Sequence, residues 1–221
     1  MKGIFITGTD TGVGKTLVAR AIVHVMRKQY DKVGVMKPVA SGAVFQNGLL
    51  QNEDAVQLQK ACNVPLPYAL INPYCFSPAI APHIAADLEG VAVDIKHIQT
   101  CYANIAQQVD VVVVEGAGGW LAPLNSTDTI ESLAQALAIP VVLVIGLRLG
   151  CLNHALLTIN AMYRSGVSVL GWIGNSIDPD FQYRDKNISA LKQRIAAPCL
   201  GLLPFSENPD IAVLAPHLQI N

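Results

Sequence analysis

Short apolar runs alternate along the chain with segments in which apolar residues recur at helical spacing. Apolar runs of roughly four to eight residues predict strands, and the helical repeat predicts amphipathic helices. We predict strands at Gly3–Thr7, Lys32–Met36, Val109–Val114, Val141–Ile145, Val169–Gly174 and Cys199–Leu203. We predict helices at Thr16–Gln29, Glu53–Cys62, Ile95–Gln108, Thr129–Leu137, Asn153–Ser165 and Asp185–Ala196.

The strand pattern indicates a sheet that is covered on both faces. The runs Val111–Val114 and Val141–Ile145 contain no polar residue, whereas a strand with one face in water would alternate. Strands separated by helices at this spacing are typical of parallel pairing. The predicted fold is therefore α/β, a doubly wound, mostly parallel sheet flanked by helices. Ligands of such sheets bind at the carboxyl ends of the strands.

One segment departs from this rhythm. Between Pro65 and Pro82 five prolines exclude a long helix. We interpret the segment as an excursion from the sheet, with a short strand at Leu70–Phe76. Because no linker, low-complexity tract or internal repeat interrupts the chain, we expect residues 1–221 to form a single domain.

Composition narrows the class of protein. A chain of 221 residues is long enough for one sizeable α/β core. Hydrophobic residues make up 52% and charged residues 14%, which suits a buried sheet or a surface partly hidden in an oligomer. The net charge of −1 and the lack of a basic run argue against a nucleic-acid partner.

The compartment is indicated by cysteines and by the N-terminus. The five cysteines include no Cys-x-x-Cys pair, so reduced thiols are expected, without a zinc site or disulfide framework. The chain enters a strand at once, without the charged region and cleavage site of a signal peptide. No apolar stretch is long enough to span a bilayer. We therefore expect a soluble, cytoplasmic protein with no membrane partner.

The first strand and the first helix are joined by a glycine-bearing loop that ends in Gly14-Lys15-Thr16. Strand, loop and helix in this order are the context of a phosphate-binding loop, whose N–H groups and helix dipole face a polyphosphate. Lys15 would approach the β- and γ-phosphates, and the Thr16 hydroxyl would bind magnesium. Five residues instead of four separate Gly8 from Gly14, and a threonine replaces the expected first glycine. A glycine-rich turn with a chance Gly-Lys-Thr is the alternative, which the flanking elements disfavour.

Charged residues follow two of the predicted strands. Lys37 lies where the second strand ends at Pro38, beside the loop, and could neutralise charge on a moving phosphoryl group or be a solvated strand-end lysine. Glu115 follows a buried strand, in the place of the carboxylate that holds the metal in nucleotide hydrolases; taken alone, it could equally be a helix cap or a surface carboxylate. Together with Lys15 and Thr16 it predicts a magnesium site.

Three further positions carry two interpretations each. Asp54 begins a helix, where an acid either complements the helix dipole or faces the site. Asn175 ends a strand, where its amide could pair with adenine or tolerate a left-handed turn. Gly150–His154 opens a helix with Asn153 as N-cap, and such a start offers N–H groups to an anion such as a carboxylate.

With these motifs in place the chain resembles the dethiobiotin synthetase family over nearly its whole length. The resemblance is carried by Gly8-Thr9-Asp10-Thr11-x-Val13-Gly14-Lys15-Thr16, Lys37-Pro38-Val39-Ala40-Ser41-Gly42, Asn72-Pro73-Tyr74, Pro82-His83, Val114-Glu115-Gly116-Ala117-Gly118-Gly119-Trp120, Gly150-Cys151-x-Asn153-His154 and Asn208-Pro209. The extra loop residue is itself a feature of this family. Related phosphate-loop enzymes lack the lysine-to-glycine and glutamate-to-tryptophan segments, so the combination is specific.

The resemblance implies a P-loop fold and an ATP-dependent ligase of biotin synthesis. Its substrates are 7,8-diaminopelargonate, CO2 and ATP with Mg2+. CO2 adds to one amine to give a carbamate, which takes the γ-phosphoryl group of ATP as a mixed anhydride. The second amine then closes the ring and releases phosphate. A carbamate is a poor electrophile and loses CO2 easily, so the site must hold it and spread its charge.

The resemblance also implies the site residues. Catalytic roles fall to Lys15, Lys37, Thr11 and Ser41, and Ser41 also contacts the substrate. Nucleotide contacts are Gly12, Val13, Gly14, Lys15, Thr16, Leu17, Asp54, Glu115, Gly116, Ala117, Gly118, Asn175, Ser176, Pro204, Phe205, Ser206 and Asp210. Magnesium would be held by Thr16, Asp54 and Glu115. The substrate carboxylate would meet Gly150, Cys151, Leu152 and Asn153 of a second subunit, which implies a homodimer.

Some positions depart from the family pattern. Gly12 replaces an acidic residue, Asn187 replaces an aromatic substrate contact of some members, and the loop near Glu207 is shorter, which leaves the ribose-side role of Asp210 open.

A second hypothesis is a nucleotide-switched dimeric ATPase of the partitioning type, whose output is partner binding. Such proteins carry an additional lysine early in the loop, where this chain has Thr9, Asp10 and Thr11. The C-terminal residues 212–221 are neither basic nor amphipathic, as a membrane or DNA segment would be. An amide-forming synthase of cobalamin type would need a glutaminase domain, for which 221 residues leave no room.

Overall fold

The computed structural model describes residues 3–46 and 48–220. Its main sheet has six strands in the order β10-β9-β8-β1-β7-β2, and all neighbours pair in parallel. The strands are β1 (Gly3–Gly8), β2 (Val33–Met36), β7 (Val111–Glu115), β8 (Val141–Leu147), β9 (Val169–Ser176) and β10 (Cys199–Leu203). Each of the six strands predicted for this sheet is present, and the doubly wound parallel sheet is confirmed. The chain leaves β1 toward β2 and later returns to the other side, so the strand order reverses beside β1.

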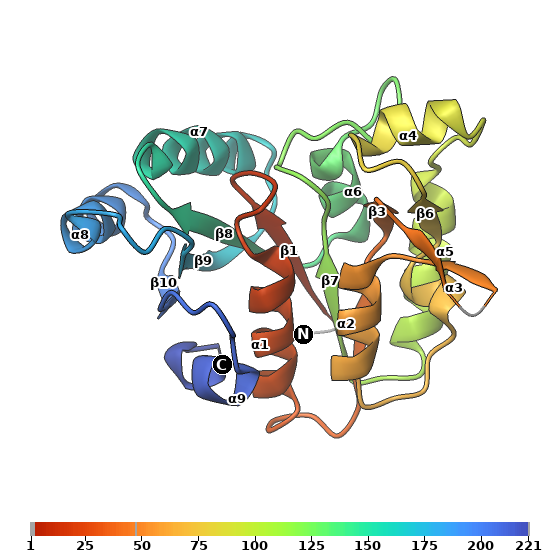
Figure 1. Cartoon of the computed structure of the whole chain (residues 1–221), viewed down its shortest axis with the longest axis horizontal. Helices are drawn as coiled ribbons and strands as arrows, with labels where there is room; N and C mark the ends of the chain where they lie inside the picture. The colour runs from red at the N-terminus through yellow and green to blue at the C-terminus, as the bar shows by residue number, and fades with distance from the viewer. Residues whose placement is uncertain (1–2, 47, 221) are drawn as a thin grey trace.

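Helices cover the sheet and the excursion. They are α1 (Lys15–Met26), α2 (Glu53–Ala61), α3 (Tyr68–Ile71), α4 (Pro82–Leu88), α5 (Ile95–Ala106), α6 (Ile130–Leu137), α7 (Cys151–Arg164), α8 (Arg184–Arg194) and α9 (Ile211–Leu214), with a 3-10 turn at Ala215–His217. Figure 1 shows α1 between α2 and α9, both of which contact it. Among the described residues no helix is long and apolar enough to cross a membrane.

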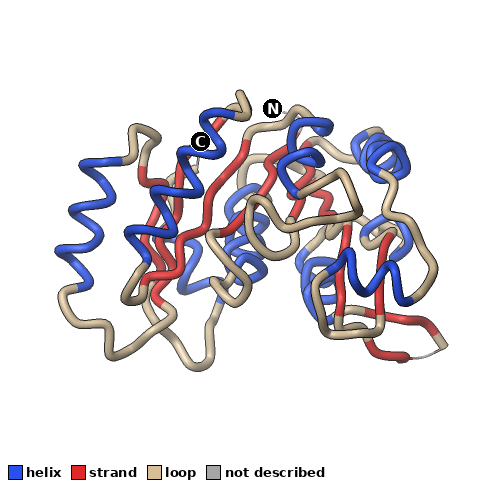
Figure 2. The backbone as a smooth tube through the Cα atoms, turned by 90° about the horizontal axis from the view of Figure 1, so that it is seen from above, coloured by secondary structure: helices blue, strands red, loops and turns tan. Residues whose placement is uncertain are grey.

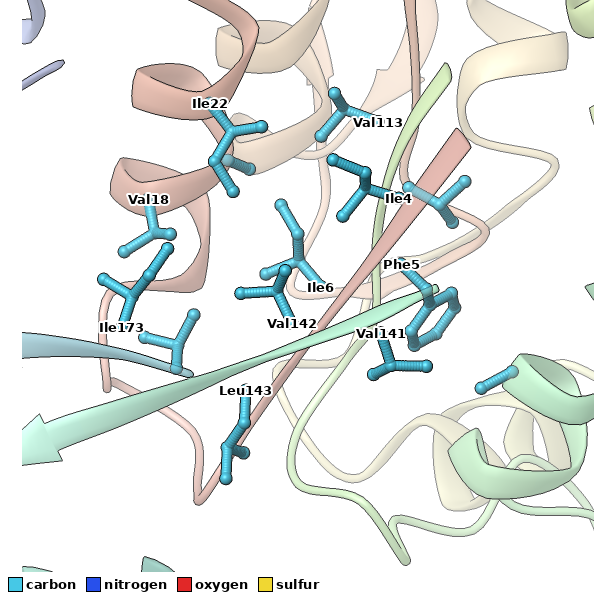
Figure 3. Close-up of a cluster of buried hydrophobic side chains, with 14 of the residues drawn as sticks. Ile4, Phe5, Ile6, Val18, Ile22, Val113, Val141, Val142, Leu143 and Ile173 are labelled. Atoms are coloured by element: carbon cyan, nitrogen blue, oxygen red, sulfur yellow. The ribbon is translucent and has the colours of Figure 1, made fainter. Parts of the chain in front are cut away.

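The core forms where α1 packs on the centre of the sheet. Alternate residues of β1 point to opposite faces. Ile4 and Ile6 lie on the side of Val18 and Ile22 of α1, whereas Phe5 points to the opposite face (Figure 3). All five side chains are fully buried. Burial on both faces explains why these strands are continuously apolar, and it makes β1 a rigid base for the loop that follows it.

Most of the elements that the sequence did not predict lie in the excursion between β2 and α5. β3 (Val39–Ser41) pairs in parallel with β6 (Tyr74–Phe76), and β4 (Val44–Gln46) forms an antiparallel hairpin with β5 (Leu49–Gln51). This hairpin projects from one end of the molecule (Figure 2). The strand predicted at Leu70–Phe76 was half wrong, because its first residues form α3. These elements, like α4 and α9, are too short for a hydrophobic period to develop.

The start of α7 also differs from the prediction. The helix begins at Cys151, and its N-cap is Gly150 in the left-handed conformation with φ of +93°, so Asn153 is not the cap. Asn153 instead lies exposed in the first turn. A glycine reaches this conformation without the steric penalty that other residues meet, and no side chain occupies the free N–H groups of the helix.

Candidate functional site

Three neighbouring strands bring the predicted site together. β7 lies between β1 and β2, so the ends of these strands place Glu115 between the phosphate loop and Lys37. A cavity of about 730 Å³ opens there. It is lined by Thr11, Gly12, Gly14, Lys15, Thr16, Lys37, Ala40, Ser41, Asn52, Asp54, Gln57, Ala79, Ile80, Ala81, Pro82, Glu115, Ala117 and Gly118. All four predicted catalytic residues and all three predicted magnesium ligands are among them.

The loop after β1 is shaped to present backbone N–H groups. Gly14, at φ of +83°, is the N-cap of α1 without a side-chain cap, which leaves the first N–H groups of the helix available to an anion. A Cβ atom at Gly14 would collide with the Asn175 amide. That amide donates to the Val13 carbonyl at 3.0 Å, and the Thr9 N–H donates to the Val144 carbonyl. The neighbouring strands β8 and β9 thus hold the loop in place.

A buried lysine links two carboxylates in the cavity. Lys37 Nζ lies 2.6 Å from Glu115 Oε1 and 3.1 Å from Asp54 Oδ2. The Thr16 hydroxyl donates to the same Glu115 oxygen at 2.8 Å. Lys37 is 4% exposed and Glu115 is 1% exposed, so this ion pair is shielded from water. Lys37 is therefore not a solvated strand-end lysine, and Asp54 is more than a helix-dipole partner.

The electrostatics favour charged forms at this cluster. Burial alone would favour a neutral Lys37 amine, but Glu115 and Asp54 overcome it and raise the Lys37 pKa above its usual value. Burial likewise opposes ionisation of Asp54, yet the charge of the Lys37 ammonium and its hydrogen bond to Asp54 hold the Asp54 pKa below its usual range. The cluster thus keeps the Lys37 ammonium and the Asp54 carboxylate charged at neutral pH.

Lys15 stands apart from this cluster. Its ammonium donates to the Asp10 carbonyl at 2.9 Å. Burial and the nearby Lys37 charge lower the Lys15 pKa to about 8, although Glu115, Asp54 and Asp10 act in the opposite direction. Negative charge brought next to Lys15 would relieve this penalty, as expected of a residue that meets phosphate oxygens.

The donor set fits magnesium. Glu115 Oε2 is buried without a hydrogen-bond partner, and a buried carboxylate oxygen is costly unless a cation or donor meets it. Carboxylate and hydroxyl oxygens are the hard ligands that Mg2+ prefers. Within the described part of the chain no group of three His, Cys, Asp or Glu side chains could hold a metal ion. The Thr16 hydroxyl and ATP oxygens would complete the set around Asp54 and Glu115.

Other predicted residues lie outside the cavity lining, namely Val13, Leu17, Gly116, Asn175, Ser176, Pro204, Phe205, Ser206, Asp210 and Gly150–Asn153. Val13 is buried, and the Gly116 carbonyl lies 3.4 Å from Lys37 Nζ. Ser176 accepts a hydrogen bond from Arg184, and residues 204–206 are exposed at the end of β10. Asp210 caps α9 by accepting from the Ala212 N–H.

Several cavity residues were not predicted. Asn52 accepts from the Asp54 and Ala55 N–H groups and so caps α2; an asparagine before a helical run is the signal that indicates it. Gln57 lies one helical turn after Glu53, whereas Ala79, Ile80 and Ala81 come from the loop before α4 and Pro82 is the first residue of that helix. Apolar loop residues leave no chemical signal in a sequence, so this wall could be found only in the fold.

Comparisons with known proteins agree with this geometry. An AAA domain family model matches residues 2–210. The ATP-dependent dethiobiotin synthetase BioD of Nitrosospira multiformis is 44% identical over 219 residues, covering 99% of this chain and 95% of its own. That of Janthinobacterium sp. (strain Marseille) is 42% identical over 221 residues, covering 98% of this chain and 94% of its own.

Solved structures with this fold are more distant in sequence. MinD cell division protein from Aquifex aeolicus gives a TM-score of 0.57 at 15% identity, covering 97% of this chain and 86% of its own. The septum site-determining protein MinD from Pyrococcus horikoshii, complexed with Mg-ADP, gives 0.56 at 18% identity over 92% of this chain and 81% of its own. These TM-scores show a shared P-loop fold, and at such low identity they show nothing finer.

Proposed function

The chain belongs to the family of ATP-dependent dethiobiotin synthetases and is an ATP-dependent ligase of biotin biosynthesis, and from this premise we propose how its cavity acts. The cavity between the phosphate loop, Lys37 and Glu115 takes 7,8-diaminopelargonate, CO2 and ATP and yields dethiobiotin, ADP and phosphate. The observation that carries the proposal is the buried Lys37–Glu115 pair in contact with Thr16 of the phosphate loop. The pair puts a positive charge beside carboxylate and hydroxyl oxygens in one cavity, which supports the proposal.

The reaction has three steps. One amine of the substrate adds to CO2 and loses a proton, which gives a carbamate. A carbamate oxygen attacks the γ-phosphorus of ATP, the bond to the β-phosphate oxygen breaks, and ADP leaves. The second amine attacks the carbonyl carbon of the mixed anhydride, the ureido ring closes, and phosphate is released.

The catalytic side chains act on charge and position. Lys15 and Lys37 both line the cavity, and both can stabilise the negative charge that spreads during phosphoryl transfer. Thr11 and Ser41 line the same cavity, and their hydroxyls can hold the carbamate or the amines in line. Thr16, Asp54 and Glu115 would hold Mg2+, which supplies a Lewis acid for the phosphate oxygens.

In this proposal the nucleotide base binds on the side of the phosphate loop where Asn175 contacts it. Asn175 is 3% exposed and already donates to the Val13 carbonyl, so its first role is to hold the loop. Reading of adenine by Asn175, with contacts from Ser176 and residues 204–206, stays a prediction. The Asp210 side chain already accepts from the Ala212 N–H as the N-cap of α9, so a ribose contact would be a second role for this carboxylate.

The substrate carboxylate requires a second subunit. Gly150 and the first turn of α7 offer helix N–H groups without a side-chain cap, yet they do not line the cavity of the same chain. Leu149 and Leu157 nearby are 87% and 64% exposed, which suits a surface that another subunit covers. We therefore propose a homodimer in which the start of α7 completes the partner's cavity. Cytoplasmic location and the lack of a nucleic-acid partner also stay predictions.

Phosphate release tests the proposed function. Wild-type protein with ATP and Mg2+ should release phosphate only when bicarbonate and 7,8-diaminopelargonate are both added, and the product should have the mass of dethiobiotin. Release that is independent of either compound would overturn the ligase assignment. It would instead favour the switch ATPase, which at present shares only its fold with this chain.

Mixed dimers test the shared site. Lys37→Ala and Leu152→Asp each disable activity in homodimers, the second because its charge repels the substrate carboxylate. If the site is shared, co-expression should recover about a quarter of wild-type activity, since half the dimers are mixed and each has one intact site. No recovery in confirmed heterodimers would place Leu152 and Lys37 in the cavity of one chain.

A further inference from the structure

Behind the catalytic cluster lies a hydrogen-bond network of three side chains that take no part in the chemistry described so far. The Tyr68 hydroxyl is its centre: it donates to Asn72 Oδ1 at 3.0 Å and accepts from the Asn52 N–H at 2.8 Å. Asn52 and Asn72 are 7% and 3% exposed, and Tyr68 is half-buried. Buried amides are costly unless their hydrogen bonds are made, so the partners of these side chains indicate what the network does.

The two amides end on the backbone of site residues. Asn72 Nδ2 donates to the Lys37 carbonyl at 2.7 Å. Asn52 Nδ2 donates to the Ser41 carbonyl at 3.0 Å, and Asn52 Oδ1 accepts from the Asp54 N–H at 3.0 Å. The network therefore joins the main chain at Lys37, at Ser41 and at Asp54.

Of these three points only Lys37 lies outside regular secondary structure, because Ser41 is the last residue of β3 and Asp54 belongs to α2. β2 and its pairing with β7 end at Met36, so the Lys37 carbonyl lies beyond the strand and accepts from Asn72 instead. Asp54 lines the same cavity as Lys37. The Lys37 N–H donates to the Ile71 carbonyl, next to Asn72. Both backbone polar groups of Lys37 are therefore hydrogen-bonded to the end of α3: its N–H to Ile71 and its carbonyl to Asn72.

From these contacts we infer that Tyr68 and Asn72 are positioning residues that fix the Lys37 ammonium against Asp54 through the backbone. The inference rests on the proposed function of the cavity. Tyr68 and Asn72 do not line the cavity, so they act only through Asn52, Lys37 and Asp54. The Lys37–Asp54 distance is 3.1 Å, and a misplacement of about 1 Å can cost roughly 100-fold in rate. This assigns a role to Asn72-Pro73-Tyr74, which no other part of the mechanism uses.

Tyr68→Phe tests the inference because it removes one oxygen and keeps the ring. The Asn52 N–H and Asn72 Oδ1 lose their shared partner, so we expect kcat to fall by about tenfold or more. The KM for ATP should change less than about twofold, because the phosphate loop is held by β8 and β9 instead. Calorimetric titration of the ADP-bound protein with Mg2+ should show weaker binding, since Asp54 is displaced.

Tyr163→Phe is the matched control. The Tyr163 hydroxyl also accepts a backbone N–H, that of Ala197 at 3.0 Å, but it lies between α7 and the start of β10. Its loss should leave kcat and the Mg2+ affinity unchanged. Equal losses in both variants, or a wild-type kcat and Mg2+ affinity in Tyr68→Phe, would overturn the inference.

Asn72→Ala supplies an independent measurement if Tyr68→Phe folds poorly. It removes the donor to the Lys37 carbonyl, and its kcat should fall at least as far as that of Tyr68→Phe. The double variant should lose little more than Asn72→Ala alone, because the residues act as one network; losses that multiply would overturn the inference. The Mg2+ titration needs no turnover, so it separates failure of this inference from failure of the ligase assignment.

Discussion

Lys37→Ala is expected to lower kcat by roughly 100-fold to 1000-fold while ATP still binds with an affinity close to that of the wild type. Lys37 Nζ contacts Glu115, Asp54 and the Gly116 carbonyl and makes no hydrogen bond to the phosphate loop. Its loss therefore removes charge stabilisation during phosphoryl transfer and leaves the loop intact. Single-turnover phosphate release and calorimetric ATP binding measure the two effects separately.

The same substitution should destabilise the protein in the absence of magnesium. Glu115 is 1% exposed, and removing one partner of a buried ion pair costs about 3–5 kcal/mol because the other charge is left without compensation. Urea unfolding in EDTA should show this loss, and Mg2+ should restore part of it by replacing the missing cation. Lys32→Ala is the matched control, because Lys32 is an exposed lysine just before the first residue of β2. It should change neither kcat nor the free energy of unfolding. A Lys37→Ala variant that loses ATP affinity alone would contradict this role.

The sheet and the floor of the site could be predicted from the sequence because their signals are local. Buried parallel strands such as β8 are continuously apolar, and the phosphate loop carries its glycines, lysine and threonine in one short stretch. Parallel strands also direct their carboxyl ends to one edge. Strand ends alone therefore placed Lys37 and Glu115 near the loop, although they are 78 residues apart in sequence.

The wall of the site and its support could not be predicted in this way. Tyr68 and Asn72 lie in a proline-rich segment of short elements, and their partners are backbone atoms of distant residues. A backbone partner leaves no mark on the residue that provides it, so no pattern links Asn72 to Lys37. The N-cap of α7 was predicted wrongly for a related reason. Asparagine is a preferred N-cap residue, which favoured Asn153, but the left-handed backbone at Gly150 starts the helix earlier.

Glu115→Gln is expected to raise the Mg2+ concentration for half-maximal rate by about tenfold or more. A carboxamide keeps the shape of the side chain but gives up the negative charge and one of the two ligand oxygens. The remaining carboxamide oxygen can still accept from Thr16 and Lys37, so the hydrogen bonds at 2.8 Å and 2.6 Å have a replacement acceptor. The loss then falls on metal binding. The initial rate at saturating substrates, measured against free Mg2+, gives the shift directly.

Glu131→Gln separates this effect from a general change of charge. Glu131 lies in the first turn of α6 and outside the cavity, so its substitution should leave the Mg2+ dependence unchanged. In Glu115→Gln the new amide nitrogen takes the place of Glu115 Oε2, which has no hydrogen-bond partner. A buried donor without an acceptor should lower the free energy of unfolding by about 1–3 kcal/mol even without metal. If Glu115→Gln instead keeps the wild-type Mg2+ dependence, Glu115 is not a metal ligand, and its pairing with Lys37 is its whole function.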